Sequence, residues 1–187
     1  MTHYIFGYGS LMNSASRRLT GKTGHTAPAT ITGFVRHWGK IETTTTASPL
    51  VVDHGDGKVN GLLLAIHEDE LSEFDVREHG YVRAQVASHA VTSTLALNAS
   101  DAVWVYLKHE PIPPCENTPI LQTYVDTVLS GCLEISEQFA IQFIENTVGW
   151  QHPLVNDRQS PRYINYAGIP DAHRPLIDAL LEKHLER

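Results

Sequence analysis

Apolar and β-branched residues form short runs in the first part of the chain, and these runs predict strands. Residues 3–6 ("HYIF") and 28–38 ("PATITGFVRHW") have the aromatic and β-branched content that strands favour. Residues 58–66 ("KVNGLLLAI") are almost continuously apolar, which is typical of a strand buried on both faces. Two further runs, 81–91 and 102–110, are separated by a segment ending in Asn-Ala-Ser-Asp, a turn signal. The pattern predicts a sheet of five or more strands.

One short helix is predicted within this β-rich part, at residues 67–80. Acidic residues fill its first turn, and Leu71, Phe74 and Val76 are expected to point inward. Gly80 then supplies the left-handed residue that commonly ends a helix.

The character of the sequence changes at residues 111–119 ("PIPPCENTP"). Four prolines in nine residues are incompatible with a strand ladder or a helix interior. Thr118 as the N-cap and Pro119 as the first helical residue then predict the start of a helix. Residues 120–150 carry apolar side chains at helical spacing, with a break near Gly131, so a pair of helices is expected.

The remainder of the chain combines an irregular segment with one more helix. Residues 151–170 are rich in Pro, Asn, Arg and Tyr, and residues 171–187 predict an amphipathic helix. Arg158 and Arg162 lie in the irregular segment. Their side chains have two interpretations, closure over a carboxylate or pairing with neighbouring acidic residues, and we favour the second, structural role. The fold class predicted from the whole pattern is mixed α/β.

Composition and charge narrow the possible functions. The chain has 187 residues, 42% of them hydrophobic, which suits one globular domain or one domain with a helical extension. Lys and Arg number 14 against 21 Asp and Glu, so the net charge is −7 and nucleic acid is a poor candidate partner. The N-terminus lacks the order of a signal peptide, and no apolar run has the length of a membrane span. We therefore expect a cytoplasmic protein without a membrane partner.

Cysteine and histidine spacing does not favour a metal site. Cys115 and Cys132 are the only cysteines and have no CxxC spacing, so they are interpreted as small buried hydrophobes. The eleven histidines include no HxH or HxxxH pair that places two imidazoles on one face. No metal is expected, although ligands from distant segments are not excluded by spacing.

A glycine-containing loop follows the first predicted strand. In "FGYGSL" two glycines allow several backbone N–H groups to converge, and such a cluster binds an anion or a developing oxyanion. Tyr8 and Ser10 add a phenol and a hydroxyl, which suit a ligand with a carboxylate or an amide. By itself the Gly-x-Gly pattern is more often an ordinary tight turn, and it lacks the spacing of nucleotide-binding loops.

A second motif makes the loop more specific. "FGYGSL" is followed some seventy residues later by "FDVREHGYVR", in which an Asp, two residues, a Glu, a glycine and an aromatic recur as Asp75, Glu78, Gly80 and Tyr81. The two motifs resemble those of the γ-glutamylcyclotransferase-like superfamily, which includes ChaC-type glutathione-degrading enzymes and AIG2-like proteins. The order of "GFVRHW", "VNGLLLAI" and the short helix also follows the family layout, so the resemblance covers roughly residues 1–110. The histidine between Glu and Gly departs from the simplest pattern.

The resemblance implies a fold, a domain organisation and an activity. It implies a small barrel-like sheet with helices in a γ-glutamylcyclotransferase-like domain at residues 1–110. A helical C-terminal extension, residues 111–187, is expected to pack on the same domain. The implied activity is a cofactor-independent release of 5-oxoproline from a γ-glutamyl compound, by attack of its own α-amine. Two alternatives are a catalytically inactive small-ligand binding protein of the same fold and an amide hydrolase that uses the same glutamate.

The implied site has one general acid/base and a set of substrate-binding residues. Glu78 is the expected acid/base. Its position at a helix end and its neighbour Asp75 favour a raised pKa, whereas Arg77 and Arg83 lower it if they approach. The substrate-binding residues expected from the resemblance are Tyr8, Gly9, Ser10, Leu11 and Tyr106, with a core position as the alternative for Tyr106. The expected partner is a small γ-glutamyl substrate; its leaving group is not specified by the sequence, and a homodimer is one of the assemblies left open.

Overall fold

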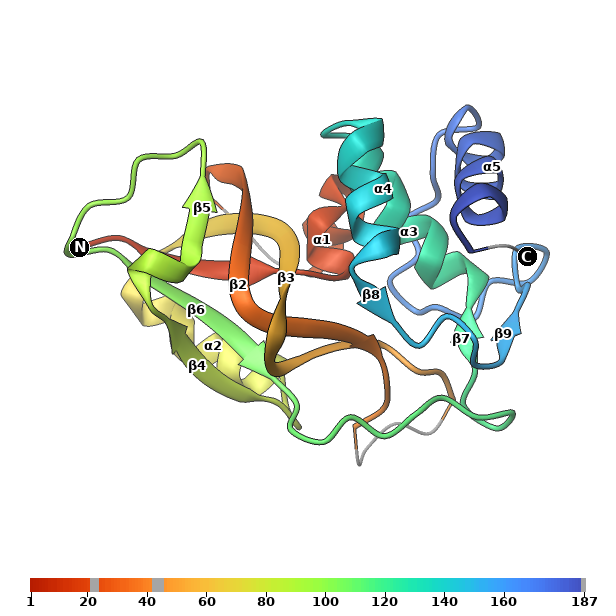
Figure 1. The fold of residues 1–187 in the computed structure, drawn as a ribbon, viewed down its shortest axis with the longest axis horizontal. Coiled ribbons are helices and arrows are strands. Elements are labelled where there is room, and N and C mark those ends of the chain that lie inside the picture. Colours follow the sequence, from red (N-terminus) through yellow and green to blue (C-terminus); the bar gives the residue numbers. More distant parts are fainter. Residues whose placement is uncertain (21–23, 42–45, 186–187) are drawn as a thin grey trace.

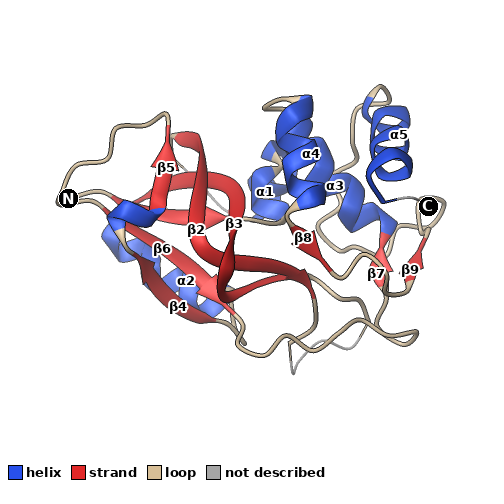
Figure 2. Ribbon diagram, in the orientation of Figure 1, coloured by secondary structure: helices blue, strands red, loops and turns tan. Residues whose placement is uncertain are grey.

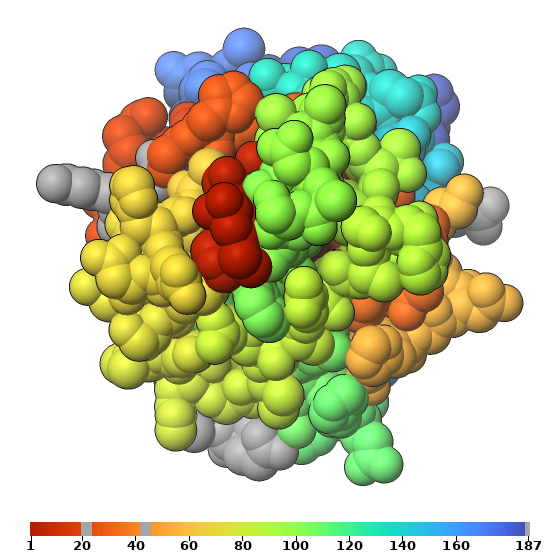
Figure 3. Space-filling view, turned by 90° about the vertical axis from the view of Figure 1, so that its left-hand side faces the viewer, coloured from red at the N-terminus to blue at the C-terminus, as the bar shows by residue number. Residues whose placement is uncertain are grey.

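The computed structural model describes residues 1–20, 24–41 and 46–185. Within these ranges a sheet curls into a half-barrel, and helices gather at one end of it (Figures 1 and 2). Figure 3 shows the opposite end, where the N-terminus lies between the α2 region and the segment after β5. The predicted mixed α/β fold with a barrel-like sheet is confirmed.

The half-barrel has seven strands in the described part of the chain. They are β1 (His3–Gly7), β2 (Thr26–Trp38), β3 (Leu50–Ile66), β4 (Val82–Val86), β5 (Val91–Ser93), β6 (Ala102–Leu107) and β8 (Thr147–Val148). The order is β4-β6-β1-β3-β2-β5, and β8 pairs with the end of β2. β1 is central, antiparallel to β3 and parallel to β6. Two short strands, β7 (Ile120–Leu121) and β9 (Leu154–Val155), pair separately in parallel.

The long β2–β3 hairpin gives the sheet much of its curvature. Its register shifts between Thr32 and Phe34, at Gly33, whose φ of +87° is readily adopted only by glycine. A bulge of this kind bends its strand and increases the local twist. Residues 59–64 of β3 are buried without alternation, as the apolar run predicts. β3 begins eight residues before the predicted start, because polar residues and glycines in this part hide its strand character.

Five α-helices and three 3₁₀ turns complete the described structure. The helices are α1 (Ser14–Thr20), α2 (Leu71–Arg77), α3 (Gln122–Leu133), α4 (Glu137–Glu145) and α5 (His173–Leu185), and the turns are η1 (Ser10–Met12), η2 (Glu68–Glu70) and η3 (Ser88–Ala90). α1, α3, α4 and α5 lie together, whereas α2 lies by β4 and β6 (Figure 1). None of these helices combines the length and the apolarity that a membrane span requires.

Two helix predictions are wrong in detail. Val76 is 80% exposed, because it lies five residues after Leu71 and therefore on the opposite face of the helix. The predicted start at Thr118 and Pro119 is also wrong, since the next two residues form β7 and α3 begins only at Gln122. The predicted break is present, slightly later than expected, between α3 and α4.

One hydrophobic core connects the sheet with the helices. It extends from Ile5 in β1 through Phe143 in α4 to Ile177 in α5, and each of these side chains is at most 1% exposed. The boundary proposed near residue 110 stays a prediction.

Candidate functional site

A cavity opens where β1 ends, and it brings together every residue that the sequence analysis assigned to the site. The loop after β1, the residue after α2 and a tyrosine of β6 all face it. The lining residues are Ile5, Phe6, Gly7, Tyr8, Gly9, Ser10, Leu11, Leu50, Arg77, Glu78, Tyr81, Tyr106 and Tyr124. The catalytic and binding roles of these residues stay predictions, but their shared location is a property of the fold.

The loop after β1 presents backbone donors to this cavity. β1 ends at Gly7 and the single turn η1 begins at Ser10, so the amides of Gly9, Ser10 and Leu11 lie in a first turn. Within the described ranges these three amides have no backbone acceptor. A Cβ atom at Gly9 would lie 2.8 Å from the Tyr124 hydroxyl, so the close approach of α3 to the loop requires glycine here.

Glu78 lies directly after α2, where the chain turns sharply. The Tyr81 amide donates to the Glu78 carbonyl at 3.0 Å, and Gly80 has the expected left-handed conformation, with a φ of +95°. The Glu78 side chain is only 22% exposed, and this burial raises the pKa of its carboxyl group. Arg77 Nε lies 3.5 Å from Glu78 Oε1 and acts in the opposite direction, lowering the pKa.

Asp75 does not contribute to the pKa of Glu78 in the way that the sequence suggested. Its Oδ1 lies 3.1 Å from Arg83 Nε and accepts a hydrogen bond from the Tyr106 hydroxyl at 2.9 Å. Asp75 thus anchors Tyr106 and forms an ion pair with Arg83. The pKa of Glu78 is raised, as expected, but the principal cause is burial.

Four tyrosines surround the carboxylate of Glu78. The Tyr8 hydroxyl donates to the Tyr106 carbonyl at 2.7 Å, and the Tyr81 hydroxyl donates to the Leu50 carbonyl at 3.3 Å. Burial raises the pKa of Tyr8, Tyr81, Tyr106 and Tyr124, so all four phenols are neutral. The cavity therefore combines one carboxylate with neutral phenols and backbone donors.

Residues 5–124 match the model of a family described as γ-glutamyl cyclotransferase, AIG2-like. The chain belongs to this family. A comparison with curated proteins gives no match.

Solved structures support the fold assignment. A protein titled γ-glutamyl cyclotransferase is similar over 96% of this chain and 99% of its own, with a TM-score of 0.58 and 14% identity. An uncharacterized protein from Homo sapiens is similar over 95% of this chain and 98% of its own, with a TM-score of 0.57 and 14% identity. YkqA from Bacillus subtilis is similar over 78% of this chain and 55% of its own, with a TM-score of 0.55 and 19% identity. At these identities the likeness concerns the fold.

Behind the loop of this γ-glutamyl cyclotransferase family member lies a buried arginine that the sequence analysis did not single out. Arg36 is fully buried, and its five N–H groups donate to Thr147 Oγ1, the Tyr8 carbonyl, both the carbonyl and Oδ1 of Asn60, and the Phe143 carbonyl. Its guanidinium also lies 3.9 Å from the centroid of the Phe143 ring. Burial lowers the pKa of Arg36 to about 9, so the group stays charged at neutral pH. A positive charge therefore lies directly behind the loop.

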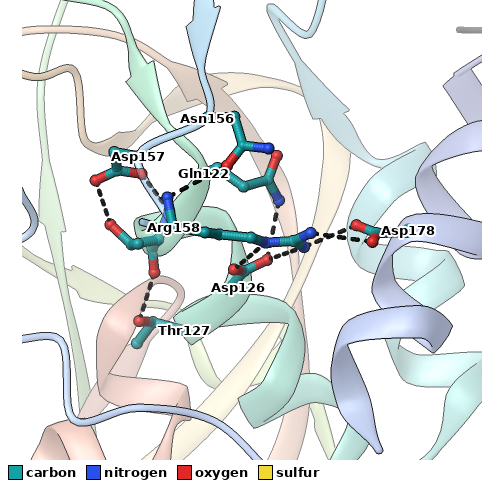
Figure 4. A network of polar contacts seen from close by, with 8 residues as sticks. Gln122, Asp126, Thr127, Asn156, Asp157, Arg158 and Asp178 are labelled. Carbon is teal, nitrogen blue, oxygen red and sulfur yellow. Dashed lines mark hydrogen bonds and ion pairs between the residues drawn. The ribbon is translucent and has the colours of Figure 1, made fainter. Parts of the chain in front are cut away.

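The C-terminal segment of this family member is tied to α3 by an acid–arginine network (Figure 4). Arg158 donates to both oxygens of Asp126 at 2.7 Å and to Asp178 of α5 at 2.7 and 3.0 Å. Asp126 is fully buried and also accepts from Gln122 Nε2 at 2.9 Å. Arg158 thus has the structural role that its acidic neighbours favoured.

The neighbouring Asp157 caps α3 from a distant part of the chain. It accepts hydrogen bonds from the Thr123 amide at 2.8 Å and from Thr123 Oγ1 at 2.6 Å. It also accepts from the Arg162 amide at 2.9 Å. The Arg162 side chain takes no part in the network and donates to the Thr46 carbonyl at 3.1 Å. The two arginines of the irregular segment therefore differ in their contacts.

The described part of the chain holds no cluster of potential metal ligands. Across the described residues, no three His, Cys, Asp or Glu side chains lie in an arrangement that would hold a metal ion.

Proposed function

We propose that this protein is a γ-glutamyl cyclotransferase that converts a γ-glutamyl compound into 5-oxoproline and a free amine. The observation that carries the proposal is the half-buried Glu78 carboxyl group in the same cavity as the loop formed by residues 8–11. Membership of the family supports the type of reaction.

In the proposed mechanism Glu78 carries protons from the α-nitrogen of the substrate to its leaving nitrogen. Its carboxylate takes a proton from the substrate's α-ammonium group, and the freed lone pair attacks the γ-carbonyl carbon. The new C–N bond closes the five-membered ring and produces a tetrahedral oxyanion. As the carbonyl re-forms, Glu78 returns the proton to the leaving nitrogen and the bond to that nitrogen breaks. The ring nitrogen still carries a second proton after the attack, and it passes this proton through Glu78 to the released amine, which leaves as an ammonium ion. The raised pKa of Glu78 suits both halves of this transfer.

The remaining barrier reduction would come from orientation and electrostatics. Holding amine and carbonyl of one molecule in attack geometry can contribute roughly 7–11 kcal/mol. The amides of Gly9, Ser10 and Leu11 are the donors available to the oxyanion or the α-carboxylate, and one such donor is worth about 3–4 kcal/mol. Arg36 stabilises the same negative charge from behind the loop through its bond to the Tyr8 carbonyl. Such a mechanism needs no activated water and no cofactor.

The test is a panel of γ-glutamyl compounds with detection of 5-oxoproline, applied to wild type and Glu78→Gln. The amide keeps the shape of the side chain but accepts no proton, so we expect turnover to fall ~10²- to 10⁴-fold. The melting temperature should equal or exceed that of wild type, because ionising a carboxyl group whose folded pKa is raised costs stability at neutral pH. Glu73→Gln, on the exposed face of the same helix, is the matched control and should retain full activity.

Product identity separates the alternatives. A hydrolase would release glutamate and would still cleave a substrate whose α-amine is acetylated, whereas cyclisation stops completely when that amine is blocked. A protein that binds γ-glutamyl compounds but releases neither product would be a ligand-binding member of the family. Near wild-type activity of Glu78→Gln would remove Glu78 from the mechanism.

A further inference from the structure

A second cavity adjoins the first, and Tyr124 lines both. The first cavity has a volume of about 80 Å³ and the second about 290 Å³. Sites for small molecules typically begin at roughly 300 Å³, so the first cavity alone is too small for a complete γ-glutamyl compound. The second cavity, which shares Tyr124 with the first, provides additional space.

The wall of the second cavity is mainly apolar and aromatic. Leu121 of β7 forms part of it, and Tyr163 packs edge-on against Tyr124 with ring centroids 4.8 Å apart. Ile164 also lines this cavity and is 91% exposed. These side chains favour an apolar chain over a strongly hydrated one.

Arg162 gives this wall its charge. Among the described lining residues it is the one with a charged side chain, and its guanidinium is paired with no described carboxylate. The single bond to the Thr46 carbonyl leaves most of its N–H donors available. A guanidinium of this kind binds a carboxylate through two parallel hydrogen bonds.

The backbone of Arg162 is held in place by the network of Figure 4. Asp157 accepts from the Arg162 amide while it caps α3, and the adjacent Arg158 bridges α3 to α5. The charged side chain thus extends from a backbone that is fixed before any ligand binds. Preorganisation of this type reduces the entropy that binding must overcome.

We propose that the second cavity holds the leaving group of the substrate and that Arg162 binds a carboxylate on it. This inference rests on the proposed cyclotransferase function, because it assigns the part of the substrate that the first cavity does not hold. The favoured substrates are γ-glutamyl derivatives of α-amino acids with apolar side chains. Derivatives of simple amines and of acidic amino acids are disfavoured.

The test compares γ-glutamyl-leucine with γ-glutamyl-3-methylbutylamide, which lacks only the leucine carboxylate. We expect Arg162→Gln to lower kcat/KM for γ-glutamyl-leucine by roughly 3- to 10-fold, mainly through KM, because the ion pair is partly exposed to solvent. The carboxylate-free compound should be unaffected, which a general structural effect of the substitution would not produce. Arg174→Gln, an exposed arginine of α5, is the matched control and should change neither value.

Binding to Glu78→Gln, measured by calorimetry with and without Arg162→Gln, gives a readout that is independent of turnover. If Arg162→Gln lowers the affinity for both compounds equally, or for neither, the proposed role of Arg162 is overturned. Turnover of γ-glutamyl-aspartate as efficient as that of γ-glutamyl-leucine would overturn the apolar preference. If no compound yields 5-oxoproline but binding still depends on the leucine carboxylate, the proposed function is refuted and the role of the second cavity is retained. If 5-oxoproline forms but binding does not depend on that carboxylate, only the role of the second cavity is refuted.

Discussion

Substitution of Arg36 tests whether the hydrogen bonds of its guanidinium stabilise the protein more than the burial of its charge destabilises it. All five N–H groups of its buried guanidinium are used, three of them at 2.8 Å. No carboxylate of the described residues forms an ion pair with it. Burial of such a charge costs several kcal/mol, so replacement by an apolar side chain has two opposing effects.

The balance can be worked out from the contacts. Hydrogen bonds to a charged group contribute about 1.5–3 kcal/mol each, so the three short bonds together contribute on the order of 6 kcal/mol. The contact with the Phe143 ring adds roughly 1–2 kcal/mol. After subtraction of a desolvation cost of several kcal/mol, we expect Arg36→Met to destabilise the protein by about 3 kcal/mol. For a domain of this size that corresponds to a melting temperature lower by roughly 6–12 °C.

Thermal unfolding and 5-oxoproline formation measure the two consequences. Arg36→Met also frees the Tyr8 carbonyl, so the loop loses its support and kcat should fall on the order of 10-fold or more. Arg36→Lys keeps the charge with only three donors and should lie between wild type and Arg36→Met in both assays. Arg18→Met, on the exposed face of α1, is the control and should stay within about 0.5 kcal/mol of wild type.

A stable Arg36→Met variant would refute this reasoning. If its melting temperature equals or exceeds that of wild type, desolvation of the charge outweighs the five hydrogen bonds. If stability falls but kcat is unchanged in the folded fraction, Arg36 supports the core and does not position the loop.

Two further predictions concern α3 and the pH dependence of activity. Asp157→Ala should destabilise the protein by about 1–2 kcal/mol, because α3 loses the cap on the Thr123 amide. Thermal unfolding measures this loss, and an unchanged melting temperature would contradict the capping role. The acid limb of kcat/KM should lie above the pH of an ordinary glutamate, because Glu78 acts ionised and burial raises its pKa. Arg77→Gln removes a charge that lowers this pKa, so the limb should move to higher pH; a shift to lower pH would exclude the assignment of the limb to Glu78.

The parts of the site that sequence predicts well are those encoded locally. The loop of residues 8–11 has a glycine where α3 approaches it closely, the turn after α2 has a glycine with positive φ, and Glu78 is fixed relative to Gly80 by that turn. Apolar periodicity likewise locates most strands and helices, since burial of one face leaves a repeating signal. The overall α/β character follows from these local patterns.

Contacts between distant segments leave no signal in the sequence that is comparable to apolar periodicity. Arg36 looks like any polar residue of a strand, and only the folded chain shows its five acceptors, which belong to four residues distant from Arg36 in the sequence. The start of α3 is a similar case. Thr118 and Pro119 have the chemistry of a helix start, but pairing with β9 extends the next two residues, and Asp157 then supplies the cap. Tertiary structure overrides a local preference of this small size.

Tyr124 shows why the C-terminal part of the chain belongs to any account of the site. It comes from α3, after the proline-rich segment, yet its hydroxyl lies against Gly9 in the loop and its side chain lines both cavities. The position of α3 is in turn fixed by Asp157 and by the pairing of Arg158 with Asp126. The loop after β1 and the turn after α2 thus supply the backbone donors and the carboxylate, whereas α3 contributes Tyr124 to both cavities and residues 162–164 of the C-terminal segment line the second. If the second cavity holds the leaving group as proposed, we expect a change of leaving group to require changes in residues 162–164 and not in Glu78.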